Sequence, residues 1–122
     1  MFGSILSALA AASFLGLGAG ALAAPRALSE SYGLPIDDEK GIAFIRGLGA
    51  RDAVLGLLIV AFLIRKDRDA LETTIALSSL VGASDFVIVA GNRGTSAPGS
   101  LAIHGTGTLG LLAVAALIRA GI

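Results

Sequence analysis

One segment of the chain, residues 41–64, reads GIAFIRGLGARDAVLGLLIVAFLI. An α-helix needs roughly 20 residues, mostly apolar, to cross the hydrocarbon core of a bilayer, and this segment meets that requirement. Three other apolar segments of similar length occupy about residues 3–24, 70–90 and 100–121. Together the four segments predict an all-α, integral membrane four-helix bundle that forms one domain over residues 1–122.

The composition also indicates a membrane protein. Hydrophobic residues make up 55% of the chain, charged residues only 15%, and the mean hydropathy is +0.87. A soluble domain of this size has a large surface for its volume and needs a polar coat, which these residues cannot supply. The formal net charge is zero and no basic cluster is present, so we expect no nucleic-acid partner. With no Cys and one His, we expect neither a metal ion nor another cofactor.

The first apolar segment, residues 3–24, allows two interpretations. Residues 21–23 (ALA) resemble the small-residue cleavage site of a signal peptide. However, no Lys or Arg precedes the apolar run, and the run is longer than a signal-peptide core, so we expect a retained helix. Gly16 and Gly20 form a GxxxG pair, which predicts contact with a neighbouring helix. We expect the connection from Pro25 to Lys40 to be a loop, because Pro and Gly break helices.

The basic residues in the connections predict the orientation, since cytoplasmic loops carry an excess of Lys and Arg. One side of the membrane would hold Arg65, Lys66, Arg68 and Arg119, and the other would hold Arg26, Lys40 and Arg93. This small excess predicts a multi-pass protein of the cell membrane with both termini in the cytoplasm.

Charged residues inside the apolar segments are the candidate functional groups, because a charge within a membrane is costly and marks function or a specific pairing. Arg51 and Asp52 lie roughly 14 Å inside the second segment. Three segments carry polar groups at similar depths, which predicts one polar pocket. Its candidate catalytic residues are Arg51, Asp52, Asp85 and His104, and its candidate ligand-binding residues are Arg46, Ser78, Thr108 and Tyr32.

Short motifs link these residues to a known family. They read YGLP at 32–35, RGLGARD at 46–52, GASD at 82–85, NRG at 92–94 and HGTG at 104–107. With these motifs the chain resembles domain-of-unknown-function family 4267, small membrane proteins of bacteria and fungi, and more distantly the DoxX-like four-helix proteins. The resemblance implies the four-helix fold and no particular activity, because the family has no established one.

Three functional hypotheses remain open at this point. In the first, the pocket binds a lipophilic small molecule, and either holds it or converts it by acid–base chemistry as an isomerase, cyclase or epoxide-opening hydrolase. In the second, the chain is a non-enzymatic membrane subunit or oligomeric scaffold, and its buried charges are structural. In the third, a homodimer forms a transporter or proton path. A cavity lined by the charged residues favours the first hypothesis, whereas close charge pairs without a cavity favour the second. Expected partners are the lipophilic molecule, membrane lipid and a homo-oligomeric copy.

Overall fold

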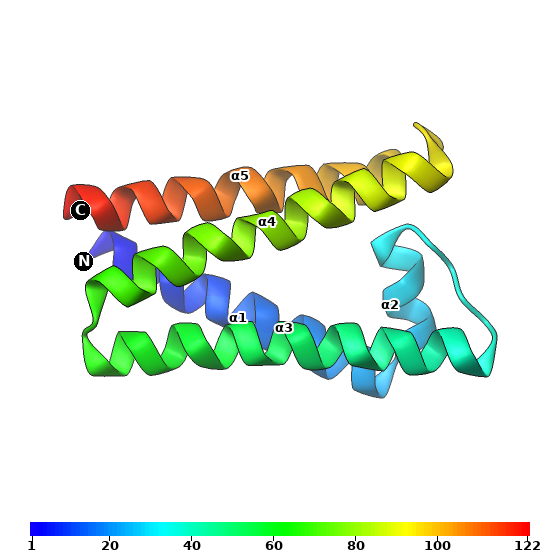
Figure 1. Cartoon of the computed structure of the whole chain (residues 1–122), viewed down its shortest axis with the longest axis horizontal. Coiled ribbons are helices and arrows are strands. Elements are labelled where there is room, and N and C mark those ends of the chain that lie inside the picture. Colours follow the sequence, from blue (N-terminus) through cyan, green and yellow to red (C-terminus); the bar gives the residue numbers. More distant parts are fainter.

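The computed structural model describes residues 1–122 as five α-helices without a β-strand. The helices are α1 (Phe2–Ala23), α2 (Pro25–Tyr32), α3 (Glu39–Arg65), α4 (Arg68–Arg93) and α5 (Pro98–Ala120). All except α2 are long and apolar enough to cross a membrane, which confirms the predicted membrane four-helix bundle. Both termini and the α3–α4 turn lie at one end of the bundle, and α2 and the α4–α5 turn lie at the other (Figure 1).

Side-chain caps fix where α3 and α4 begin. The carboxylate of Asp38 accepts a hydrogen bond of 2.8 Å from the Gly41 backbone N–H, and that of Asp67 accepts one of 3.1 Å from Ala70. Such caps satisfy amide groups that have no partner inside the helix. Lys66 ends α3 in the left-handed conformation, with φ of 55°. The turn is therefore tight, and α3 and α4 run antiparallel.

The predicted loop over residues 25–40 is wrong in its first half, because residues 25–32 form α2. Pro25 stands in the first turn of this helix. A backbone N–H at this position would have no partner within the helix, so its absence in Pro costs nothing, and the fixed φ of Pro suits the helix. Gly33 ends the helix with φ of 108°, a conformation that favours glycine. The Ser29 hydroxyl accepts a hydrogen bond of 3.0 Å from the Ile36 backbone N–H and so ties the following segment to α2.

The bundle consists of two tightly packed helix pairs, α1 with α3 and α4 with α5. Glycine permits the close approach within each pair. A Cβ atom on Gly18 of α1 would lie 2.8 Å from the Gly49 carbonyl oxygen of α3. A Cβ atom on Gly82 of α4 would lie 2.6 Å from Oγ1 of Thr108 on α5.

The predicted helix contact is wrong for Gly16, and Gly20 contacts only the short helix α2. Gly16 is exposed, and a Cβ atom there would have nothing within 4 Å, while the nearest atom for Gly20 is 3.7 Å away on Leu28 of α2. The small residues that meet α3 lie on another face of α1, centred on Gly18. GxxxG spacing shows that a close contact is possible but does not show which face of a glycine-rich helix makes it.

Between the two pairs, the halves of the bundle differ in polarity. An apolar core occupies the half nearer the termini and consists of Ala11, Phe14, Ile59, Leu71, Ile75, Val114, Ala115 and Ile118. The half nearer α2 contains the buried charges. This division places the polar groups where the two pairs are joined by side-chain hydrogen bonds rather than by apolar packing.

Candidate functional site

Arg51 lies near the middle of α3 and joins α3 to α4. Its Nε donates a hydrogen bond of 3.0 Å to Oδ1 of Asp52, the next residue on the same helix, and its Nη2 lies 3.0 Å from the same oxygen. The same Nη2 lies 3.3 Å from Oδ2 of Asp85 on α4. Both carboxylates are buried. The pairing gives each carboxylate an ionic hydrogen bond to Arg51, and each of the three groups would be costly if left alone in an apolar environment.

Tyr32 extends this network from α2. Its hydroxyl donates a hydrogen bond of 3.0 Å to Oδ1 of Asp85. Burial, and then the neighbouring Asp85 carboxylate, raise the pKa of the Tyr32 phenol above its ordinary value. The hydroxyl is therefore held in its protonated, donating form.

His104 of α5 completes the network through the backbone of α2. Its Nε2 lies 2.8 Å from the Tyr32 carbonyl oxygen, and the two rings pack edge to face with centroids 4.9 Å apart. Because a carbonyl oxygen can only accept, Nε2 carries the hydrogen of this bond, and Nδ1 is the acceptor when the imidazole is neutral. The tautomer of His104 is thus set by the position of α2.

A second bond fixes the end of α2 against α4. Nη1 of Arg93 donates a hydrogen bond of 3.0 Å to the Gly33 carbonyl oxygen. Gly33 also lies close to α5, since a Cβ atom there would be 2.8 Å from Cβ of Ser100. The end of α2 is therefore held between α4 and α5, and with it the Tyr32 side chain.

Three polar atoms of the cluster make no hydrogen bond within the protein: Nη1 of Arg51, Oδ2 of Asp52 and Nδ1 of His104. No fully buried side-chain nitrogen or oxygen lacks a partner, so these three atoms are accessible. Both oxygens of Asp85, in contrast, are already bonded. The cluster can therefore offer one cationic donor and two acceptors to another molecule, and Asp85 holds the other groups in place.

The cluster lines a cavity of about 520 Å³ to which all five helices contribute. Most of the wall is apolar, and Leu6 and Val114 line the end nearer the termini. Arg51, Asp52, Asp85 and His104 all line it, as do Tyr32 and Ser78. The volume lies within the range of about 300–1,000 Å³ seen for small-molecule sites, which also combine apolar walls with a few polar groups.

Two of the predicted ligand-binding residues do not line this cavity. Arg46 is exposed on α3, because a separation of five residues from Arg51 turns it to another side of the helix. Thr108 donates a hydrogen bond of 2.8 Å to the His104 carbonyl oxygen and lies at the α4–α5 contact. Ser78 does line the cavity, and its hydroxyl donates to the Thr74 carbonyl oxygen at 2.7 Å, as residues of this type commonly do within helices.

Sequence reasoning did not foresee the part that the α2 backbone plays in the site. The carbonyl oxygens of Tyr32 and Gly33 bind His104 and Arg93. Every residue has a backbone carbonyl group, so the residue types of a sequence do not show which carbonyl oxygens take part in a site. The sequence did contain a signal for this helix, because residues 25–33 begin with Pro and end with Gly, residues that are common at the start and just after the end of a helix.

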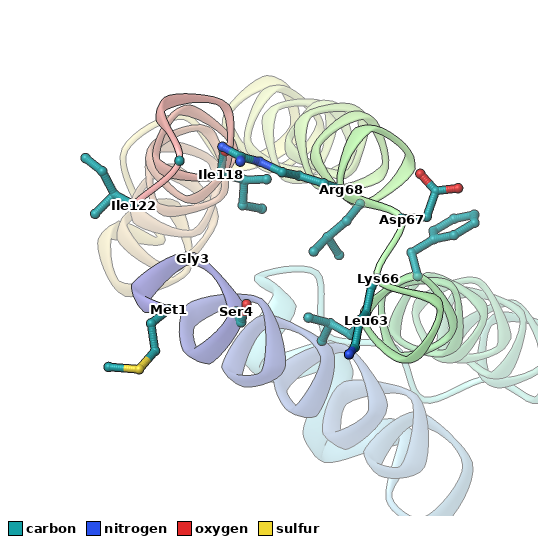
Figure 2. A pocket seen from close by; sticks show the side chains of 12 residues that line it. Met1, Gly3, Ser4, Leu63, Lys66, Asp67, Arg68, Ile118 and Ile122 are labelled. Carbon is teal, nitrogen blue, oxygen red and sulfur yellow. The ribbon is translucent and has the colours of Figure 1, made fainter.

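A smaller pocket of about 220 Å³ lies at the opposite end of the bundle, beside both termini (Figure 2). The Arg68 side chain extends across to the last turn of α5, where its Nε donates a hydrogen bond of 2.8 Å to the Ile118 carbonyl oxygen. Its Nη2 also contacts the carbonyl oxygens of Ile118 and Arg119. Arg68 therefore caps the end of α5, where basic side chains commonly bond the last carbonyl groups.

The resemblance seen in the motifs is confirmed at the level of a whole family. The model of a domain of unknown function, DUF4267, matches residues 11–118. The chain belongs to this family. Every residue of the polar cluster falls within the matched range, from Tyr32 to His104. The family description assigns no activity, and no curated protein and no solved structure matches the chain. The more distant similarity to DoxX-like proteins stays a prediction.

Proposed function

We propose that this membrane protein binds a lipophilic small molecule in the cavity between its two helix pairs. The observation that carries the proposal is a cavity with apolar walls whose α2 end presents accessible atoms of Arg51, Asp52 and His104. An apolar body would occupy the part lined by Leu6 and Val114, and a polar group would bind at the cluster. This combination suits a molecule that dissolves in a bilayer.

The same atoms support acid–base conversion of the bound molecule. Oδ2 of Asp52 and Nδ1 of His104 can accept a proton, and Nη1 of Arg51 can stabilise negative charge that develops on an oxygen. Asp85 acts as a positioning residue, because Tyr32 and Arg51 occupy both of its oxygens. The reaction classes that fit are an isomerase, a cyclase and an epoxide-opening hydrolase, and none needs a cofactor. We place the protein in the cell membrane, with both termini cytoplasmic.

The test is the composition of the purified protein. The chain is reconstituted in nanodiscs of one defined lipid, extracted with organic solvent and examined by mass spectrometry. The wild type should carry a lipophilic compound that empty nanodiscs lack, and Asp52→Asn should carry much less of it. Asp69→Asn is the matched control, because Asp69 is an exposed carboxylate in the first turn of α4, far from the cavity.

A second candidate function is a non-enzymatic subunit or scaffold, and the closed pairing of Arg51 with two carboxylates favours it. In this case Asp85→Asn should lower the free energy of unfolding in detergent by about 1–3 kcal/mol, because Tyr32 and Arg51 lose a charged hydrogen-bond partner while Arg51 keeps its bond to Asp52. The amount of lipophilic compound should then be the same in both proteins. A fall in bound compound with a smaller loss of stability supports ligand binding.

A further inference from the structure

The cavity is not closed on all sides, and its exposed wall belongs chiefly to two helices. On α1, Leu9 and Leu17 line the cavity while remaining 59% and 45% exposed, and on α5 Ile103 is 60% exposed. None of the lining residues of α3 or α4 is exposed. The cavity therefore opens between α1 and α5, on the side away from α3 and α4.

The course of these two helices explains the opening. They meet at the end that holds the termini, where the Gly3 backbone N–H donates a hydrogen bond of 2.9 Å to the Ile122 carbonyl oxygen. From there α1 and α5 diverge toward the α2 end (Figure 1). The exposed lining positions recur at helical spacing, at residues 9, 13 and 17 on α1 and residues 103, 107 and 110 on α5. Two facing stripes thus form the rim of a lengthwise opening.

The rim lies within segments that cross the membrane, and it is almost entirely apolar. Ser13 of α1 is its exposed polar residue, and the others are Leu, Ile and Gly. The exposed Ser31 of α2 also lines the cavity, outside the two stripes. Such a rim suits contact with acyl chains and gives water or an ion little to bind. The charged cluster lies behind it, among the residues of α3 and α4 that are not exposed.

We infer that the opening between α1 and α5 is a lateral entrance through which the ligand passes directly from the bilayer. The inference rests on the proposed function and specifies the class of ligand. The molecule is dissolved in the hydrocarbon phase and carries one compact polar group, which reaches Arg51, Asp52 and His104 after the apolar body has passed the rim. Its size is limited by a cavity of about 520 Å³.

Two glycines of the rim allow the entrance to be narrowed without disturbing the fold. A Cβ atom on Gly107 or on Gly110 would have nothing within 4 Å. A leucine at either position therefore has room, and its side chain would lie in the opening. Gly16 of α1 has the same open surroundings but does not line the cavity, so Gly16→Leu is the matched control.

The experiment measures access to the cavity with thiol reagents, since the chain has no cysteine of its own. Val81→Cys places a thiol on the α4 wall of the cavity, and Val87→Cys places one on the outer face of the same helix. For each reagent, the rate at position 81 in nanodiscs is divided by its rate with free cysteine. This relative rate should be at least several-fold higher for pyrene maleimide, which enters the bilayer, than for a charged trimethylammonium methanethiosulfonate, which stays in the water. Adding Gly107→Leu or Gly110→Leu should slow pyrene maleimide several-fold at position 81 and leave position 87 unchanged.

Three results would overturn the lateral entrance. One is faster modification of position 81 by the charged reagent, which would mean access from water. Another is no effect of either leucine beyond that of Gly16→Leu. The third is a change of oligomeric state caused by the rim variants, which would assign this face to a second copy of the chain. None of these depends on whether a compound is extracted from the wild type, so a failure of the proposed function would be seen separately.

Discussion

Asp85 holds together side chains from three helices, and this explains why an acidic residue is tolerated in a membrane-spanning segment. Its oxygens accept hydrogen bonds from Tyr32 of α2 and Arg51 of α3, and the residue itself is only 6% exposed. A carboxylate bonded on both oxygens by an uncharged and a charged donor loses less on transfer from water than a bare one.

Tyr32 gives a pH-dependent signal for this arrangement. Its raised pKa means that the folded protein binds the phenolic proton more tightly than the unfolded chain, where the value is about 10. The corresponding stability is fully present below pH 10 and is lost as the pH rises through the raised pKa. Tyr32 is the chain's only tyrosine, so its phenolate absorbance can be followed directly during an alkaline titration.

The titration midpoint of the wild type should therefore lie above the ordinary value of 10.0. In Asp85→Asn it should fall only part of the way back, because the effect of the carboxylate disappears while burial, the largest single cause, remains. A wild-type midpoint at the ordinary value would show that the phenol is not enclosed as described.

At the scale of single residues, the sequence predicted which charged groups are buried better than it predicted their roles. Arg51, Asp52, Asp85 and His104 could be found because charge is rare and costly in apolar segments. Which of them position other groups and which are accessible could not be predicted, because this depends on which individual oxygen or nitrogen atoms are already hydrogen-bonded. That information appears only when α2 and α4 are placed beside α3.

The helices themselves follow from the sequence with one exception. Four apolar runs predicted α1, α3, α4 and α5, since length and hydropathy are direct requirements of a membrane crossing. Helix α2 was missed because it is short and polar. It packs against α1 and α3, and hydrogen bonds at its C-terminal end tie it to α4 and α5. The faces that pack were also not predictable, because α1 carries several glycines and small residues on more than one side.

The contact of α1 with α3 can be tested with two glycines on different faces of the same helix. Gly18→Leu should destabilise the protein by about 1–3 kcal/mol or more, because a Cβ atom there would lie 2.8 Å from the Gly49 carbonyl oxygen and 2.9 Å from Cβ of Ala53. Gly16→Leu should have little effect, since its surroundings are open. Unfolding of both variants in detergent measures the difference, and equal stabilities would argue against this packing.

The whole molecule is best described as two helix pairs joined differently at their two ends. Apolar packing joins them near the termini, and hydrogen bonds involving Arg51, Tyr32 and His104 join them near α2. The cavity lies between the pairs. Hydropathy predicts four helices but not which of them are neighbours, so this arrangement could not be derived from the sequence.

The four crossings place the α3–α4 turn and the α4–α5 turn on opposite sides of the membrane. A cysteine at exposed Asp69 should be labelled by an impermeant reagent only from the cytoplasmic side, and one at exposed Thr95 only from the other side. Labelling intact cells and then opened cells with the impermeant reagent shows which side of the membrane each cysteine faces. Modification of both positions from the same side would exclude the four-crossing topology, and an exchange of sides would reverse the orientation.

The bond between Arg51 and Asp52 has a consequence for biosynthesis. These residues are neighbours on one helix, so they can pair before any other helix is present. A lone Arg or Asp at the centre of a helix costs about 2.5–3.5 kcal/mol during insertion by the translocon. A helix that carries its own counter-charge lowers this cost, so Asp52 reduces the cost of inserting Arg51 with α3. Asp85 of α4 adds a second carboxylate to this pair when α4 packs against α3.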